Sequence, residues 1–201
     1  MKLHLGCGKR FLKGYLHIDV DLHDHIDIQT SIDKLPMIQD STVDVIYTCG
    51  VLEYFDIEEV NTVLQEFKRV LKVGGILRTS VPNFESIVKV YNETSNIYAE
   101  GILGPLFGRI EINSGDKTEF IHHKIVYDYK LLRDVLSKNG FCDISYFDPF
   151  DVFPEDYDDY SKSFIPYKDR NGLPIHLNLE CKYCIMYLSY DTSLLSQFVS
   201  G

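Results

Sequence analysis

The sequence has no apolar run approaching the roughly 18–20 residues that a membrane-spanning helix needs. Its opening residues, MKLHLGCGKR, lack the apolar stretch of a signal peptide, so we expect a cytoplasmic protein. Basic residues are outnumbered, 20 against 30 acidic ones, and they form no stripe, which disfavours nucleic-acid binding. We therefore expect this acidic chain of 201 residues and net charge −10 to bind neither membranes nor nucleic acid.

Cysteine is also scarce. Five cysteines in a chain without a secretion signal are expected to be free thiols. Cys181 and Cys184 form one C-x-x-C pair, but a zinc site needs about four ligands and the sequence has no second pair. The surrounding segment resembles a strand, in which positions three apart lie on opposite faces. We therefore expect no metal or redox chemistry at this pair.

Strand and helix patterns alternate along the chain. Apolar, strand-like segments lie at 2–5, 15–20, 43–48, 76–81, 141–147 and 179–190. Helical spacing of apolar residues predicts one helix over 56–71 and another beginning after Asp128. The alternation predicts an α/β fold with a Rossmann-like, doubly wound and mostly parallel sheet. No helix-length pattern separates the last two strands, so the final strand is expected to run antiparallel.

The two predicted helices have start and stop signals. Asp56 and Asp128 are candidate N-caps, because a short carboxylate can accept hydrogen bonds from free backbone N–H groups. Gly74-Gly75 and Asn139-Gly140 are expected to end the first and second helix, since glycine readily takes the left-handed conformation of a C-cap.

A single domain is expected over residues 1–201. In an open α/β sheet, ligands bind beyond the carboxyl ends of the strands. Two connections at that edge, at about 84–127 and 148–178, are much longer than usual, so we expect them to form a lid or a substrate wall. The part around 154–160 mixes acidic and aromatic residues, which suits either an amine or sugar pocket or a solvated lid.

A glycine loop and an acidic residue predict a cofactor site. Gly6-Cys7-Gly8 directly follows the first strand, where glycine lets a ligand approach the backbone closely. Asp19 ends the neighbouring strand, where a carboxylate can accept both hydroxyls of a ribose. A dinucleotide would need a third glycine, but Phe11 occupies that position. S-adenosylmethionine has no phosphate and is therefore favoured over NAD.

The order of several sequence strings carries a more specific resemblance than any one of them. Five strings occur in order, namely LHLGCG, HIDVD, DKLPM, STVDVIYTCGVLEYF and EFKRVLKVGGILRTSVPNF. Together they resemble a class I S-adenosylmethionine-dependent methyltransferase. More narrowly, they are similar to small bacterial methyltransferase-domain proteins associated with surface-polysaccharide genes. The resemblance covers roughly residues 1–84 and continues more weakly through HHKIVYDYKLLRDVLSKNGF.

The resemblance implies a set of cofactor-binding residues on three further segments besides the ribose ligand. They are Gly6, Cys7 and Gly8 at the methionine moiety and sugar, Ser31, Ile32 and Asp33 beside the adenine, and Cys49, Gly50 and Val51 toward the carboxypropyl arm and the substrate. Only ten residues join the first two strands, whereas a parallel crossover usually needs a dozen or more. This short connection leaves the ribose ligand open between Asp19 and Asp21.

Methyl transfer to a hydroxyl also needs a base. His122 and His123 are candidates, because histidine titrates near neutral pH. Tyr54, which stands where many relatives have histidine, is a third candidate for the catalytic site. We therefore expect a methyltransferase that acts on a small molecule or glycan, with O- or N-methylation, in which a sugar is one candidate acceptor. The alternative is a non-catalytic binding or scaffold protein that retains the fold, and an NAD-linked oxidoreductase ranks third.

Overall fold

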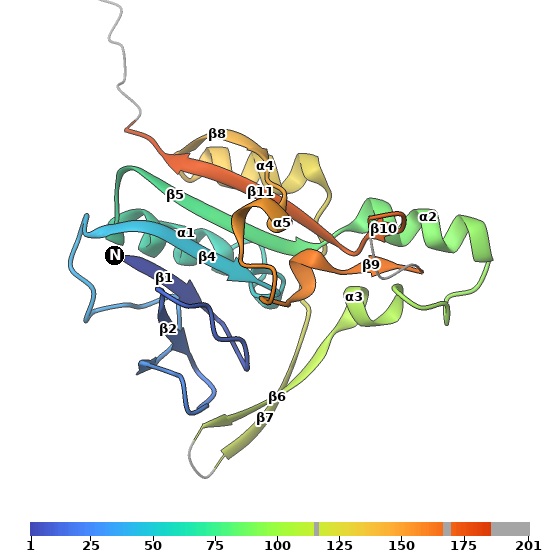
Figure 1. Ribbon diagram of the computed structural model, residues 1–201, viewed down its shortest axis with the longest axis horizontal. Helices are drawn as coiled ribbons and strands as arrows, with labels where there is room; N and C mark the ends of the chain where they lie inside the picture. The colour runs from blue at the N-terminus through green and yellow to red at the C-terminus, as the bar shows by residue number, and fades with distance from the viewer. Residues whose placement is uncertain (115–116, 167–169, 186–201) are drawn as a thin grey trace, which may run out of the picture.

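The computed structural model describes residues 1–114, 117–166 and 170–185. Its centre is a seven-stranded sheet in the order β3-β2-β1-β4-β5-β11-β8 (Figure 1). These strands are β1 (Lys2–Leu5), β2 (Leu16–Asp19), β3 (Ile28–Gln29), β4 (Val43–Cys49), β5 (Leu71–Pro82), β8 (Phe141–Tyr146) and β11 (His176–Tyr183). The strands β1 to β5 pair in parallel, and β11 runs antiparallel to both of its neighbours. The predicted Rossmann-like α/β fold with an antiparallel final strand is confirmed.

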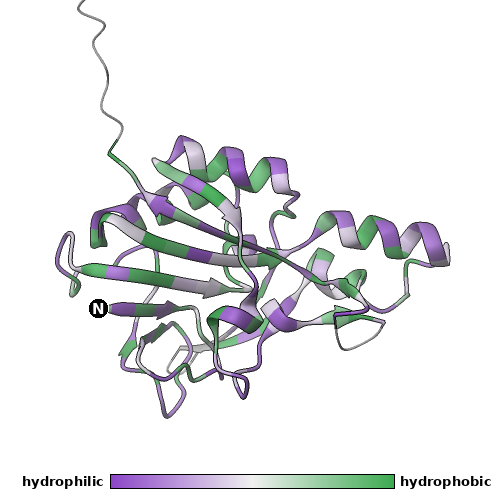
Figure 2. Cartoon of the chain, turned by 45° about the horizontal axis from the view of Figure 1, so that its top comes forward, coloured by the Kyte–Doolittle hydropathy of each residue, from purple (hydrophilic) through white to green (hydrophobic). Residues whose placement is uncertain are grey.

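Two helices cover one face of the sheet, α1 (Glu59–Val70) and α4 (Tyr129–Lys138) (Figure 1). Their apolar stripes join the main core, in which Phe67 and Leu136 are fully buried with Ile46 of β4. Figure 2 shows hydrophobic residues concentrated along the central strands, while hydrophilic residues recur on the outer helices. The helical periodicity therefore reflects burial against the sheet.

The predicted start of the second helix at Asp128 is confirmed, whereas the first helix begins at Glu59, after the candidate cap Asp56. The Asp56 carboxylate accepts hydrogen bonds from the backbone N–H groups of Glu58 and Glu59, at 2.9 and 2.8 Å. Asp128 accepts from the N–H of Leu131 at 2.7 Å. The predicted end of the first helix is wrong, because Gly74-Gly75 lies inside β5 and the helix already stops at Val70. Leu71 turns directly into the extended conformation of the next strand.

The opposite face is covered mainly by irregular chain. No helix lies in the short crossover from β1 to β2, which runs from Gly6 to Tyr15 within the described residues. Instead, a second core cluster packs Tyr47 of β4 against Leu12, Phe153 and Tyr157. Because successive side chains of a strand point to opposite faces, Ile46 and Tyr47 enter different clusters. The segment between β8 and β11 thus covers the sheet face that a helix in the first crossover would otherwise cover.

The two long connections carry structure of their own. The first contains α2 (Phe84–Thr94), α3 (Leu103–Phe107) and a hairpin of β6 (Arg109–Ser114) and β7 (Lys117–His122), which projects from the body in Figure 1. The second contains α5 (Pro149–Val152), the short strands β9 (Phe164–Ile165) and β10 (Leu173–Pro174), and a 3₁₀ turn, η2 (Tyr160–Lys162). A further turn, η1 (Leu52–Tyr54), follows β4.

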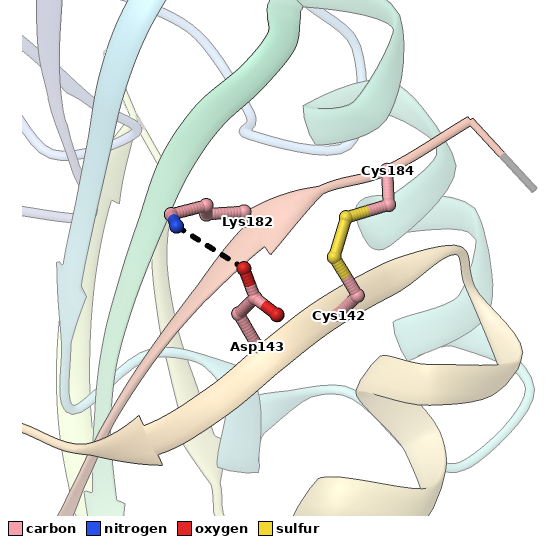
Figure 3. The surroundings of a disulfide bond; sticks show 4 residues. All are labelled: Cys142, Asp143, Lys182 and Cys184. Carbon is pink, nitrogen blue, oxygen red and sulfur yellow. Dashed lines mark hydrogen bonds and ion pairs between the residues drawn. A yellow bond between two sulfur atoms is a disulfide. The ribbon is translucent and has the colours of Figure 1, made fainter.

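Cysteine pairing differs from the expectation. Cys142 of β8 and Cys184, just after β11, form a disulfide with a Cα–Cα distance of 5.9 Å (Figure 3). The prediction of five free thiols is therefore wrong for these two residues, because antiparallel pairing of Tyr183 with Phe141 brings them together. Cys181, the other member of the C-x-x-C pair, is free and fully buried. The predicted continuation of the last strand to Tyr190 lies outside the described residues.

Among the helices that the structure describes, none has the length and apolar composition to span a membrane.

Candidate active site

The glycine loop after β1 meets the loop after β4. Gly6 has a φ of +65°, and a Cβ atom at this position would lie 2.5 Å from Cγ2 of Val51. The Gly6 N–H donates to the carbonyl oxygen of Ile18 at 2.8 Å, which also joins the loop to β2. Gly8 has a φ of +52°, but nothing lies within 4 Å of the place where its Cβ would stand. Glycine is thus required by packing at the first position and leaves open space beside the backbone at the second.

Asp19 joins the glycine loop to the end of β2. One of its carboxylate oxygens accepts from the Gly8 N–H at 2.7 Å, and the other accepts from the Asp21 N–H at 2.8 Å. The residue is 7 % exposed, so both bonds lie in a partly dry environment. Asp21 instead points its carboxylate toward His23, with 3.4 Å between Oδ2 and Nε2. The structure therefore brings Asp19, and not the carboxylate of Asp21, to the glycine loop.

The segment 31–33 follows β3 next to this corner. Just before it, the N–H of Thr30 donates to the backbone carbonyl of Asp19 at 2.9 Å. Ser31 is exposed and Asp33 half-buried, whereas the side chain of Ile32 is turned into the main core. The structure thus holds this segment beside the carboxyl end of β2, with its polar side chains outward.

Cys49, Gly50 and Val51 form the turn that leaves β4. Gly50 has a φ of +70°, and its N–H donates to the carbonyl of Ser80 at 2.9 Å. Burial raises the pKa of the Cys49 thiol well above its usual range, and burial likewise raises the pKa of the Cys7 thiol to about 12. Both sulfur atoms are therefore protonated at neutral pH, which makes them apolar contacts more than nucleophiles.

Glu53 was not selected from the sequence, but the structure places it directly behind this turn. Its side chain is 1 % exposed, and its Oε2 has no hydrogen-bond partner among the described residues. Burial raises the pKa of this carboxyl to about 8. A Cβ atom on Gly50 would lie 3.7 Å from Oε1, so the carboxyl borders the turn itself. The sequence signal was its position, three residues after Gly50.

The three predicted catalytic residues do not all come together. His123 lies with its side chain 7 % exposed, and its Nε2 is 3.8 Å from Oε1 of Glu53. Its Nδ1 lies 2.8 Å from the carbonyl of Pro105, and Tyr54 packs edge-on against its ring at 4.7 Å. His122, one residue earlier, is exposed and lies at the base of the hairpin, opposite Arg109. Because successive residues of an extended chain point to opposite sides, the side chains of His122 and His123 at the end of β7 point in opposite directions.

The acidic aromatic segment at 154–160 is only partly a surface feature. Asp159 is buried and accepts hydrogen bonds from the hydroxyls of Tyr47 and Tyr157, at 2.6 and 2.9 Å. Tyr160 is 60 % exposed, and its ring stacks on His176 with 5.4 Å between centroids. The interpretation of this segment as a solvated lid is therefore wrong for Asp159 and Tyr157, which hold it onto the sheet.

The loops after β1, β2 and β4 provide features that fit a nucleoside-type cofactor carrying a methionine chain. Gly8 offers open space beside its backbone, and the Asp19 carboxylate stands at that opening with acceptor capacity left for hydroxyl groups. The Glu53 carboxyl, whose Oε2 has no hydrogen-bond partner among the described residues, adds a buried polar group beside Gly50. The donor set contains no cluster of basic residues for a pyrophosphate.

A family model described as a methyltransferase domain matches residues 3–79. Over these residues the chain is similar to methyltransferase domains. The match confirms the predicted enzyme class, an S-adenosylmethionine-dependent methyltransferase, and the predicted cofactor. The matched part contains the loops after β1, β2 and β4, while the second long connection lies outside it.

Solved structures share the fold of this methyltransferase. A SAM-dependent methyltransferase from Methanosarcina mazei superposes with a TM-score of 0.55 at 18 % identity, covering 92 % of each chain. One from Archaeoglobus fulgidus gives 0.51 at 15 % identity, covering 90 % of this chain and 85 % of its own. The 1,6-didemethyltoxoflavin N1-methyltransferase of Burkholderia thailandensis, with bound S-adenosylhomocysteine, gives 0.51 at 11 %, covering 92 % and 71 %. No curated protein matches the chain in sequence.

Proposed function

We propose that this methyltransferase transfers a methyl group from S-adenosylmethionine to a hydroxyl or amine of a small molecule or glycan. The bridge from Gly8 to Asp19 is the observation that supports the cofactor site most directly, because it couples the glycine loop to a carboxylate. The Burkholderia neighbour, a methyltransferase with bound 1,6-didemethyltoxoflavin, supports a small-molecule acceptor. The resemblance to polysaccharide-associated proteins adds sugars to the candidate acceptors.

In this proposal each cofactor loop contacts a different part of S-adenosylmethionine. Asp19 accepts the ribose hydroxyls, with the glycine loop of Gly6, Cys7 and Gly8 beneath the sugar and the methionine chain. Ser31, Ile32 and Asp33 border the adenine, and Cys49, Gly50 and Val51 border the carboxypropyl arm. Asp21 is left with its carboxylate toward His23. When bound, the cofactor supplies a methyl group already activated by a sulfonium.

The protein then has to position the acceptor and remove its proton. Orientation alone can contribute roughly 7–11 kcal/mol to such a displacement. Of the predicted bases, His123 has the better geometry: its Nδ1 donates to the Pro105 carbonyl, which leaves Nε2 unprotonated beside Glu53. Tyr54 packs against that ring, and His122 is too exposed to share its surroundings. Residues 1–201 act as one domain in this proposal, with the insertions at about 84–127 and 148–178 forming the acceptor side.

The test compares two aspartate variants by calorimetry with S-adenosylhomocysteine. Asp19→Ala should weaken binding by roughly 10- to 100-fold, the value of one or two hydrogen bonds to a charged group. Asp21→Ala is the matched control and should bind within a few-fold of the wild type. Circular dichroism at the same concentrations checks that both variants fold. Unchanged affinity of Asp19→Ala together with a loss for Asp21→Ala would move the ribose ligand to Asp21.

A further inference from the structure

A cavity of about 530 Å³ lies on the ligand edge of the sheet, outside the three cofactor loops. The end of β8 and the start of β11 form its floor, and the connection between them forms its walls. His176 opposes Pro82, the last residue of β5, so the start of β11 lies at the carboxyl edge of the parallel strands. This is the edge at which an acceptor has to approach the cofactor.

The cavity has the lining of a site for an uncharged ring. Its aromatic side chains are Tyr146, Phe147, Phe150 and Phe164. The charged residues among its described lining are Arg170 and Asp148, and these pair with each other at 3.1 Å. The Arg170 guanidinium also lies over the Phe150 ring at 4.6 Å, which engages it further. Aromatic walls with a neutralised ion pair favour a neutral planar or cyclic ligand over an anion or a cation.

A chain of hydrogen bonds fixes the ring of His176 at the inner end of this cavity. The amide Nδ2 of Asn178 donates to the carbonyl of Ser161 at 2.9 Å, so its Oδ1 is the acceptor. The Ser80 hydroxyl donates its only proton to that Oδ1, at 2.6 Å. Its oxygen, 3.2 Å from Nδ1 of His176, must therefore accept from an Nδ1–H group. The proton of the neutral imidazole is thus held on Nδ1.

The other ring nitrogen carries the lone pair. No described residue hydrogen-bonds to Nε2 of His176. Four described side-chain atoms are fully enclosed and lack a partner, and Nε2 of His176 is not one of them. Burial lowers the pKa of the imidazole to about 4, so the ring is neutral at physiological pH. On its other side, Nδ1 is 4.0 Å from Sγ of Cys49 in the cofactor turn. The ring therefore stands between that turn and the cavity.

We propose that the cavity binds the methyl acceptor, a neutral cyclic compound bearing a hydroxyl group, and that Nε2 of His176 is the catalytic base that receives the hydroxyl proton. This inference rests on the proposed function, names its acceptor class and assigns the role of base to His176 in place of His123. The shared chemistry is a hydroxyl on a ring that can stack on aromatic side chains, and both phenols and sugars provide it.

The step balances without a further reactant. The hydroxyl oxygen forms a bond to the methyl carbon as the carbon–sulfur bond breaks, and the sulfur keeps that electron pair as a thioether. The hydroxyl proton passes to Nε2, and the resulting imidazolium releases it to solvent. Because the hydroxyl becomes strongly acidic as the new bond forms, a base of low pKa suffices. Ser80 and Asn178 act as positioning residues, since they keep the proton of the imidazole on Nδ1 and leave Nε2 unprotonated.

Nitrogen-15 NMR of the histidine side chains tests the geometry directly. The signals of His176 are assigned by their loss in His176→Phe. We expect a neutral ring with the proton on Nδ1 near pH 7. With S-adenosylhomocysteine bound, p-cresol or methyl glucoside at millimolar concentration should shift the Nε2 signal, and the responding compound distinguishes the phenol from the sugar. A proton on Nε2, or no response to either compound, would overturn the proposal.

Matched variants test the cavity and the base separately. Phe150→Ala removes an aromatic wall and should abolish most probe binding, whereas Phe84→Ala removes an equally exposed ring on α2 and should not. His176→Phe should weaken probe binding roughly five-fold, as the loss of one neutral hydrogen bond. It should also slow methyl ether formation by roughly 100-fold. Equal probe binding by Phe150→Ala and Phe84→Ala would place the acceptor elsewhere.

Affinity for S-adenosylhomocysteine, measured on the same samples, separates this inference from the proposed function. His176→Phe, Phe150→Ala and Phe84→Ala should all retain wild-type affinity. A protein that binds S-adenosylhomocysteine but shows no probe response contradicts the acceptor site alone. A protein that does not bind S-adenosylhomocysteine contradicts the proposed function itself. Probe binding without methyl transfer to either compound would limit His176 to holding the ligand and overturn its role as base.

Discussion

Gly6 and Gly8 both have positive φ angles, yet their surroundings predict different responses to substitution. Gly8→Ala adds a Cβ into open space and should cost only the backbone term, about 1–2 kcal/mol. Gly6→Ala also drives that atom into Val51, so we expect a loss of about 3 kcal/mol in the free energy of unfolding. Urea denaturation measures both. Val51→Ala should partly rescue Gly6→Ala, and equal losses for the two glycine variants would contradict the packing described here.

Glu53 predicts a pH dependence of stability. Its pKa is raised to about 8 in the folded protein by burial, against an ordinary value of 4.5, so the folded state binds this proton more tightly than the unfolded state does. The associated stability is therefore fully present below about pH 4.5 and is lost as the pH rises through 8. The difference is on the order of 5 kcal/mol.

Glu53→Gln removes this titration, so denaturation midpoints at pH 5 and pH 8 provide the measurement. The variant should gain stability relative to the wild type at pH 8 and much less at pH 5. Glu58→Gln, at an exposed carboxylate before α1, is the control and should follow the wild type at both values. A Glu53→Gln variant that is no more stable than the wild type at pH 8 would show that the carboxyl is compensated in the folded state.

Single residues could be selected from the sequence only where their position in the fold follows from a strand end. Asp19 was one of two candidates because it ends β2, and the hydrogen bond from Gly8 distinguishes it from Asp21. The contrast between His122 and His123 could not be predicted, since it depends on which side chain of a projecting hairpin turns inward. His176 was missed because its importance depends on partners about a hundred residues away, such as Ser80.

Among the helices and strands, hydrophobic periodicity correctly predicted those that bury an apolar face. Apart from β3, which was not predicted, the strands of the central sheet and the helices α1 and α4 lie within a few residues of their predicted places, because each buries an apolar face. The error at Gly74-Gly75 arose because glycine was taken as a helix stop, while β5 already begins at Leu71, before the two glycines. The hairpin and α2 were not predicted, because their partly exposed faces give weak patterns.

The pairing of β8 with β11 also predicts an effect of reduction. The disulfide closes a segment with a sequence separation of 42, for which chain entropy gives up to about 4 kcal/mol. A reducing agent should therefore lower the urea midpoint of the wild type and leave Cys142→Ser unchanged. Thiol counting in denaturant is the independent check. It should find three reactive thiols, from Cys7, Cys49 and Cys181, and a count of five would contradict the bond.

The whole molecule divides its two sheet faces between different kinds of cover. Helices cover one face, and on the other the chain between β8 and β11 replaces the helix that the ten-residue first crossover is too short to form. That same chain walls the cavity at the ligand edge. The architecture thus explains how a short crossover and a long later insertion occur together in one chain. The sequence showed both lengths, but only the packing relates them.

In the proposed function, the loops after β1, β2 and β4 hold S-adenosylmethionine. Isothermal titration calorimetry of the wild-type protein with S-adenosylmethionine, and separately with S-adenosylhomocysteine, tests it most directly. We expect saturable binding of both at a single site, with a matching rise in melting temperature. No detectable binding of either compound at millimolar concentration would show that these loops do not form the cofactor site.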